Sequence, residues 1–352
     1  MNTRTLIWLA GALAVLAALA VVGQRQTVPV TALDGNSAFL PGLMDSLESV
    51  TTISIVGANN EPVATLSRGA DGWTIGERGG YRADLTKVRH TLLSLAEAEI
   101  LEPKTANPAL HSRLGVAAVD AQDATGLAVT LSGPAAPVTI IVGDAAGDYR
   151  RYARRDGEDQ SYLINRDPEL GATAADWLDT AIIDLPAERV REVTVTHPDG
   201  ETLHVFKESR EQMNFTVEGI PDGRSLLYDS VANVMGSVLQ NLTLEDVEPA
   251  TESAMAPPIT EFRTFDGLTV TVHGIKRDDT AWIGISATAD PSSGADEPAS
   301  AESEAGDATP ARDPLQEAAT INARLAGWRF RIPTYKYEQL TRRMADLLQA
   351  QS

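Results

Sequence analysis

The pattern of apolar and polar positions occurs twice along the chain, in Val50 to Glu102 and in Val190 to Glu248, about 140 residues apart. Each stretch holds three short runs of alternating apolar residues separated by polar turns, which is typical of strands, and then a helical pattern. The runs are 52–56, 62–66 and 72–75 in the first copy, and 192–196, 201–206 and 214–217 in the second. The repetition predicts two related halves with the same order of elements.

A helix follows the three strands in each copy. In the first copy Asp84 is the expected N-cap, and the apolar face consists of Leu85, Val88, Leu92, Leu93 and Leu95. In the second copy the apolar face consists of Leu226, Leu227, Val231, Val234, Met235, Val238 and Leu242.

Further strands and one more helical stretch complete each half. The additional strands are predicted at 126–131, 138–142, 149–154 and 161–164, and at 268–272, 282–285 and 327–333. A short helical stretch is predicted at Trp177, Leu178, Ile182 and Ile183. A closing helix is predicted from about Thr334, with Tyr337, Leu340, Met344, Leu347 and Leu348 facing the core.

These elements predict an α+β protein with an N-terminal transmembrane helix and two tandem duplicated domains of antiparallel sheet, with helices packed on one side. The predicted parts are an anchor at 1–23, a linker at 24–49, a first domain at 50–188 and a second domain at 189–352. Pro186 punctuates the boundary between the domains. The second domain carries a disordered acidic insertion at 290–313, which lacks aromatic and β-branched apolar residues.

Leu6 to Gly23 is a run of 18 uncharged residues. As a helix it covers about 27 Å of a hydrocarbon layer about 30 Å thick. A cleaved signal peptide is the alternative, because Ala18-Leu19-Ala20 offers an A-x-A cleavage site, but the run exceeds the usual signal-peptide length. We expect an uncleaved single-pass anchor in a bacterial inner membrane, with the N-terminus cytoplasmic and the bulk of the chain periplasmic.

The amino-acid composition excludes several classes of partner and of chemistry. The net charge of −20, from 49 acidic and 29 basic residues, repels nucleic acid. The absence of cysteine excludes disulfides, a thiolate nucleophile and Cys-ligated metals. Only 5% of the residues are aromatic, so the cores are expected to consist of Val, Ile, Leu and Ala.

The motifs that mark enzymes are missing from the sequence. There is no GxSxG, SxxK, Walker A, GxGxxG or HExxH pattern. His197 and His204 can meet across a hairpin, but neutral strand histidines are the favoured interpretation over a metal site. We therefore expect a non-enzymatic protein with no catalytic, cofactor-binding or metal-binding residues.

The dense basic cluster of the chain consists of Arg150, Arg151, Arg154 and Arg155, with aromatic residues interleaved. These arginines are candidate contacts for an anionic glycan, a lipid headgroup or an acidic partner. The alternative is that they pair with acids of the turn 156–159 on a solvated strand pair. Asp144 and Asp148 lie in a glycine-flanked turn, and turn chemistry is favoured there over a calcium site.

Two other features bear on partner binding. Trp73 and Trp328 end strands in opposite halves, and core packing is favoured over an exposed role in gripping a ligand. Two sheets need not cover all their edges, and an open edge is a site for strand addition by a partner.

Three segments carry a family resemblance: Asp71 to Ile75, Gly143-Asp144 after the strand 138–142, and Gly327 to Lys336. With the N-terminal anchor, they resemble the bacterial DUF4340 proteins. Members of that family have no known biochemical function and are associated with gliding-motility-type ABC transporter components: an ATPase, a permease and a large auxiliary protein. The resemblance implies a membrane-tethered accessory subunit whose partner is the permease or the auxiliary protein. An envelope ligand-binding protein or enzyme acting on glycan or lipid is the alternative.

Overall fold

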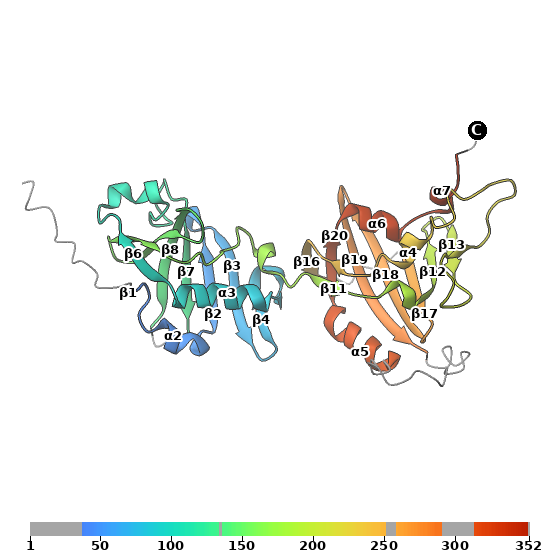
Figure 1. Cartoon of the computed structure of the whole chain (residues 1–352), viewed down its shortest axis with the longest axis horizontal. Coiled ribbons are helices and arrows are strands. Elements are labelled where there is room, and N and C mark those ends of the chain that lie inside the picture. Colours follow the sequence, from blue (N-terminus) through green and yellow to red (C-terminus); the bar gives the residue numbers. More distant parts are fainter. Residues whose placement is uncertain (1–36, 134–135, 251–257, 291–312, 351–352) are drawn as a thin grey trace, which may run out of the picture. The chain divides into compact units, whose positions relative to one another are not determined.

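The computed structural model describes residues 37–133, 136–250, 258–290 and 313–350 (Figure 1). The predicted transmembrane helix lies outside these residues, as do positions 291–312 of the predicted acidic insertion. Among the described residues, no helix has both the length and the apolar character needed to cross a membrane.

The described chain is α+β, built mostly of antiparallel strands with few helices, as predicted. The first sheet contains β1 (Ser37–Ala38), β2 (Thr52–Val56), β3 (Pro62–Gly69), β4 (Gly72–Ile75), β5 (Tyr81–Arg82), β6 (Glu99–Pro103), β7 (Leu127–Ser132), β8 (Val138–Ala145), β9 (Arg151–Arg155) and β10 (Ser161–Ile164). The second sheet contains β12 (Val190–Thr196), β13 (Thr202–Phe206), β14 (Thr216–Val217), β16 (Asp246–Pro249), β17 (Ile259–Thr264), β18 (Leu268–Arg277), β19 (Thr280–Ala289) and β20 (Trp328–Ile332). A small ladder joins β11 (Ala181–Ile183) to β15 (Leu242–Thr243).

Contacts divide the chain into two compact units. The first comprises the residues up to Val63 together with Arg89–Leu170, and the second comprises Ala64–Val88 together with the residues from Gly171 onward. The domain bounds predicted from the sequence, 50–188 and 189–352, stay a prediction.

Six strands have the same spatial order in each unit. In the first unit the order is β2-β7-β8-β9-β10-β6, and in the second it is β12-β17-β18-β19-β20-β16. Each neighbouring pair is antiparallel, and in both sets the second strand in sequence order lies at the far end, beside the last one. The two sheets therefore follow one topology.

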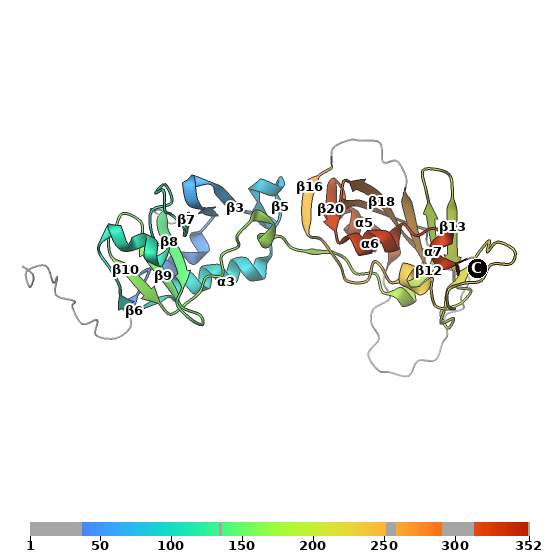
Figure 2. The same cartoon turned by 90° about the horizontal axis from the view of Figure 1, so that it is seen from above.

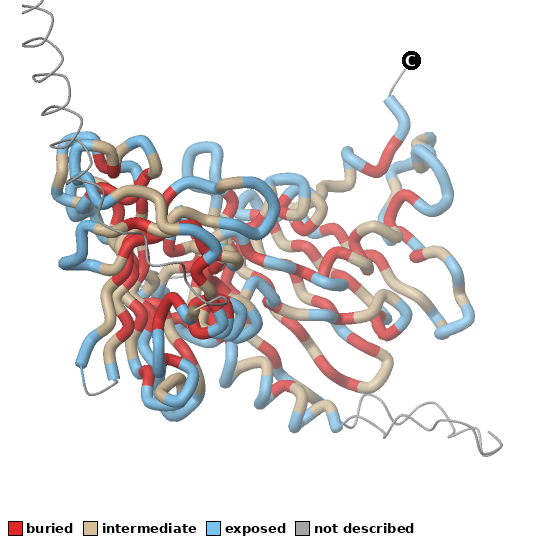
Figure 3. Tube along the Cα trace, turned by 60° about the vertical axis from the view of Figure 1, so that its left-hand side comes forward, coloured by how far each residue is buried: buried red, intermediate tan, exposed pale blue. Residues whose placement is uncertain are grey.

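Alternation of apolar and polar residues explains why these segments form strands. Along β18, Leu268, Val270 and Val272 are buried, whereas Thr269 and Thr271 are half-buried on the opposite face. Figure 3 shows the same alternation of buried and less buried positions along other strands. The buried set is dominated by Val, Ile, Leu and Ala, as expected from the low aromatic content.

The helices are α2 (Leu43–Ser46), α3 (Leu85–Ala96), α4 (Asn233–Gly236), α5 (Pro314–Leu325), α6 (Thr334–Leu340) and α7 (Met344–Leu347). Short 3₁₀ turns are η1 (Leu47–Ser49), η2 (Ala58–Asn60), η3 (Gly76–Arg78), η4 (Pro108–Leu114), η5 (Ala174–Trp177) and η6 (Ala187–Arg189). Helices α5 and α6 flank the strands of the second sheet (Figures 1 and 2).

The prediction for α3 is confirmed, including its N-cap. The carboxylate of Asp84 accepts hydrogen bonds from the backbone N–H of Thr86 at 2.8 Å and of Lys87 at 3.2 Å. The buried side chains of this helix include Val88 and Leu95, whereas Leu85 and Leu93 of the predicted face are exposed.

The prediction of a helix across Leu226 to Leu242 is wrong. The chain forms turns there, with the four-residue α4 between them, and Leu242 enters β15. Asn233 uses its side-chain oxygen to accept a hydrogen bond from the backbone N–H of Phe215 at 3.0 Å. The segment is also rich in Ser, Asn, Asp and Gly, which have low helix propensity. Four of the apolar side chains are still buried, namely Val231, Met235, Val238 and Leu242, whereas Leu227 is 47% exposed.

Two other helix predictions need correction. The stretch Trp177 to Ile183 is η5 followed by strand β11, because Thr173 and Asp176 cap a single turn. The closing helix is divided into α6 and α7 at Arg343, whose backbone is extended. At this break between the two helices, Arg343 pairs with Asp199 at 2.8 Å and with Glu201, which lie at the turn between β12 and β13.

Candidate functional site

The four arginines of the basic cluster do not form one open surface. Arg154 is 6% exposed, and its guanidinium donates from Nε to the carbonyl of Val116 at 2.8 Å and from Nη1 to the carbonyl of Glu158 at 2.9 Å. These bonds attach β9 to the loop after η4. Arg154 therefore holds the fold together, and Arg150 is the exposed member of the cluster.

Arg155 makes a separate set of contacts. Its Nε donates to the carbonyl of Phe39 at 2.8 Å, and its Nη1 lies 3.0 Å from a carboxylate oxygen of Glu158. Its guanidinium also lies 5.3 Å from the ring centroids of Phe39 and Tyr162. The pairing with turn acids that the sequence suggested as an alternative is present at this residue.

Arg151 lines a polar cavity at the end of β8. Its Nε lies 3.0 Å from a carboxylate oxygen of Asp167, and its Nη1 donates to the carbonyl of Gly143 at 3.3 Å. The cavity, of about 140 Å³, is also lined by Asp144 and Gly126. The contacts with Asp167 and Gly143 hold the Arg151 side chain at the rim of this cavity. A role for the four arginines in anion or partner binding stays a prediction.

The predicted histidine and aspartate features are dispersed. His197 bonds through Nε2 with the carbonyl of Arg342 at 3.2 Å, whereas His204 lies between Glu218 and Glu192, at 2.6 Å from Nδ1 and 3.4 Å from Nε2. The two histidines thus have different partners. Within the described ranges, no group of three or more His, Asp or Glu side chains is arranged to hold a metal ion.

Trp73 and Trp328 pack against the protein. Trp73 is 9% exposed. Trp328 is half-buried and meets the Tyr81 ring edge-on, with 5.0 Å between centroids. Burial raises the pKa of Tyr81 to about 12, so its hydroxyl stays neutral at physiological pH.

A buried ion-pair cluster attaches helix α5 to the second sheet. Arg189, 8% exposed, donates from Nη1 and Nη2 to the two carboxylate oxygens of Glu317, each at 2.8 Å. Nη2 also bonds Asp266 at 2.8 Å, and Thr264 donates to the same carboxylate. The hydrogen bonds to Glu317 raise the pKa of Arg189. This bidentate geometry fixes both the position and the rotation of α5.

The Asp266 carboxyl has a shifted pKa. Burial opposes ionisation of Asp266, but hydrogen bonds from Thr264 and Arg189 outweigh it and hold the pKa of Asp266 below its ordinary value. Asp266 is therefore ionised at neutral pH and contributes the second negative charge around Arg189.

A second contact joins α5 to the backbone of β19. The side-chain oxygen of Asn322 accepts from the N–H of Ala287 at 2.8 Å, and its side-chain nitrogen donates to the Ala287 carbonyl at 2.7 Å. One amide side chain thus makes the two hydrogen bonds that a residue of a neighbouring strand would make.

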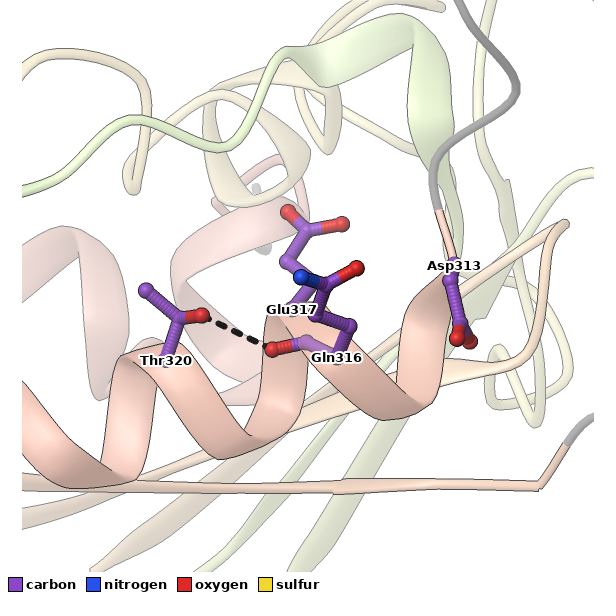
Figure 4. Close-up of a pocket in the computed structure, with 4 residues that line it drawn as sticks. All are labelled: Asp313, Gln316, Glu317 and Thr320. Atoms are coloured by element: carbon purple, nitrogen blue, oxygen red, sulfur yellow. Dashed lines mark hydrogen bonds between the residues drawn. The ribbon is translucent and has the colours of Figure 1, made fainter.

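The solvent side of α5 borders an open hollow of about 340 Å³. Its lining includes Asp313, Gln316, Glu317 and Thr320 (Figure 4). Thr320 donates its hydroxyl hydrogen to the backbone carbonyl of Gln316 at 2.8 Å, and both carboxylate oxygens of Glu317 are occupied by Arg189. Asp313 and Glu317 thus hold the helix in place, whereas the Gln316 side chain is exposed. We take α5 with the adjoining residues Gly284–Ala289 of β19, together called the α5–β19 edge, as the candidate functional site.

Sequence reasoning missed this site, although a local signal for α5 was present. Asp313 is the N-cap and accepts from the N–H of Leu315 at 3.0 Å, with Pro314 in the first turn. Gln316 stands three residues after Asp313, which is the spacing of a capping box. That signal would have placed the helix, but the partners Arg189 and Ala287 lie too far away in the sequence to be identified from it.

Comparison with protein families gives a match, and comparison with individual proteins does not. Residues 73–258, just over half of the chain, match the family model described as a domain of unknown function, DUF4340. No curated protein and no solved structure matches the chain. The family match spans the end of the first repeated stretch and all of the second, including η6 with Arg189. The chain belongs to the DUF4340 family.

Proposed function

We propose that this chain is a non-enzymatic accessory protein of an ABC-transporter-type complex of the gliding-motility kind. It is anchored in a bacterial inner membrane through residues 6–23 and acts in the periplasm through contacts with the permease or the auxiliary protein. The observation that carries the proposal is the six-strand order found in both units, which fits a tandem duplication. The sheet is repeated, but the charged clusters around Arg154 and Arg189 are not, as expected where no catalytic site was duplicated.

The chemistry of the described polar clusters supports the same proposal. The guanidinium groups of Arg154 and Arg189 donate hydrogen bonds to carbonyl and carboxylate groups of the same chain. A buried guanidinium that already bonds groups of its own chain is poorly placed to bind a substrate, because breaking those bonds leaves an uncompensated buried charge. A duplicated fold whose buried charges are paired within the chain suits a protein that acts by binding other proteins through its surface.

Copurification tests the proposal. The full-length chain with a C-terminal tag would be purified from its native host in mild detergent, and the accompanying proteins identified by mass spectrometry. The matched control is a single-pass membrane protein of similar size with the same tag. We expect a permease or large auxiliary subunit to be enriched with this chain and not with the control. Recovery of the chain with no transporter or envelope component would count decisively against the proposal.

A further inference from the structure

Strand β19 is longer than the strand that pairs with it on one side. On the other side β18 pairs with all ten residues of β19, from Leu268 opposite Ala289 to Arg277 opposite Thr280. The ladder to β20 covers only Ala281, Trp282 and Ile283. In the described part of the chain, no strand pairs with Gly284–Ala289 on the β20 side.

The backbone groups of this segment that face away from β18 point toward α5. In an antiparallel ladder, successive residues direct their N–H and C=O groups to opposite sides. Ala287 directs both groups at Asn322, away from β18. Asp290, in the opposite phase, donates to the carbonyl of Gly267 beside β18. Ile285 and Ala289 alternate in step with Ala287, so their backbone groups face the same side, away from β18.

Helix α5 covers this edge with a small hydrophobic contact. Of its 12 residues, Ala318 and Leu325 are buried, and Leu315 is 54% exposed. Its other attachments are the Arg189–Glu317 pair, the Asn322 bonds and a hydrogen bond from Arg324 to the carbonyl of Ala181 at 3.4 Å. A helix of this length is marginal without tertiary packing, so its position depends on these few contacts.

Among the described residues of the first unit, no helix covers the corresponding place. There β10 pairs with four consecutive residues of β9, from Arg151 opposite Ile164 to Arg154 opposite Ser161, and a short turn joins the two strands. The unpaired half-strand and the helix over it are therefore features of the second unit.

We propose that the edge of β19 from Ile285 to Ala289 accepts an extended strand of a partner protein, and that α5 is the displaceable cover of this edge. The inference rests on the proposed function in taking the ligand to be a protein. A partner strand would exchange the two bonds of Asn322 for as many as two backbone bonds at each of Ile285, Ala287 and Ala289.

The side chains of β19 define the chemistry of the partner strand. Ile285 and Ala287 are buried, whereas Ser286 and Thr288 lie on the opposite face. A partner strand would continue this alternation, with apolar side chains on the core face and polar side chains on the other. A strand with a charge on its core face would be rejected.

A designed peptide tests the proposal on the full-length protein in detergent. The probe is fluorescent Thr-Val-Thr-Val-Thr-Val with blocked ends, and its control is the same peptide N-methylated at alternate residues, which removes the hydrogen bonds of one edge. We expect the unmodified probe to bind and the N-methylated probe to bind at least tenfold more weakly. Equal binding of the two probes, or no binding of either to any variant, would overturn the proposal.

Variants of α5 locate the binding. Asn322→Leu removes both bonds to Ala287, and Asn322→Asp removes only the donor. We expect each to tighten probe binding at least tenfold, because α5 no longer competes as well for the edge. Gln316→Leu, the matched change on the solvent side of the same helix, should leave binding unchanged. Tightening by Gln316→Leu to the same extent, or by neither Asn322 variant, would refute the role of α5.

Hydrogen exchange identifies the segment and separates this proposal from the proposed function. In Asn322→Leu the amides of Ile285, Ala287 and Ala289, which face away from β18, should exchange faster, and the bound probe should protect them again; circular dichroism would show that the variant is folded. Protection elsewhere in place of residues 284–289 would contradict the site. No transporter component is present in this assay, so its failure removes strand addition and leaves the copurification result standing.

Discussion

Arg189 and Glu317 are 128 residues apart in the sequence and are joined by two parallel hydrogen bonds of 2.8 Å. The pair links the entry of β12 to the first turn of α5, and Asp266 bonds the same guanidinium from the turn before β18. Three segments thus meet at one buried cation. Displacement of α5 from β19 requires this pair to open or to turn with the helix, so the pair sets the stability of the cover.

Removing the charge of Glu317 should loosen α5. Glu317→Gln leaves Arg189 with one carboxylate partner in place of two, and we expect a loss of about 1–3 kcal/mol in the free energy of unfolding, typical of hydrogen bonds to charged groups. Denaturant unfolding followed by tryptophan fluorescence measures it. Glu338→Gln, an exposed change on α6, is the control and should be neutral within about 0.5 kcal/mol. Equal effects of the two changes would show that the buried pair adds nothing to stability.

Acid should destabilise the protein partly through Asp266. Its pKa is lower in the folded chain than its ordinary value of 3.8. A depressed carboxyl pKa stabilises the fold above the unfolded value, and the stabilisation is lost as pH falls below about 3.8 through the folded value. Unfolding midpoints measured from pH 6 down to pH 2 should fall less steeply below about pH 4 for Asp266→Asn than for the parent chain. Parallel curves would contradict the assignment.

The four arginines of the basic cluster should separate by stability. Arg154→Ser removes two hydrogen bonds from a buried guanidinium, leaving the carbonyls of Val116 and Glu158 without their donors, and we expect a loss of roughly 1–3 kcal/mol. Arg150→Ser alters an exposed side chain and should change stability by less than about 0.5 kcal/mol. Thermal unfolding of the two variants side by side checks the difference. Similar melting temperatures would mean that Arg154 is not a structural residue.

Gly126 should tolerate no side chain. A Cβ atom at this position would lie 2.0 Å from the carbonyl oxygen of Gly115 and 2.9 Å from that of Val142, and both are backbone atoms that cannot rotate away. Gly126→Ala should therefore destabilise the protein by roughly 1–3 kcal/mol through overpacking. Gly76→Ala is the control, because its nearest neighbour atom would be at 3.6 Å. Urea unfolding of both variants measures the difference, and equal stabilities would contradict the close packing at Gly126.

The pattern of apolar and polar residues was sufficient to predict those elements whose structure depends on residues close together in the sequence. Strands β2 and β4 appear at their predicted positions because strict alternation leaves them one buried face, and α3 begins after Asp84 because the carboxylate satisfies free N–H groups. The helix predicted from Leu226 failed since apolar spacing alone takes no account of Asn233 and its bond to Phe215.

The candidate site depends on contacts that one sequence does not reveal. Asn322 and Ala287 are 35 residues apart, and an asparagine within a helix is ordinarily a neutral surface residue. That it completes the edge of a strand follows from where β20 stops pairing, which is a property of the assembled sheet. Helix α5 itself was recognisable by its Asp-Pro cap, but its role was not.

The strand order that the two units share also determines how late in synthesis all strands of each sheet can pair. In both units the second strand of the set is synthesised before the four strands that will lie between it and the first strand: β6 precedes β7 to β10, and β16 precedes β17 to β20. Its partner is the last strand of the set, so β16 has no sheet to join until residues 328–332 have emerged from the ribosome. Such non-local closure slows folding and leaves β16 unpaired while the rest of the second sheet is synthesised.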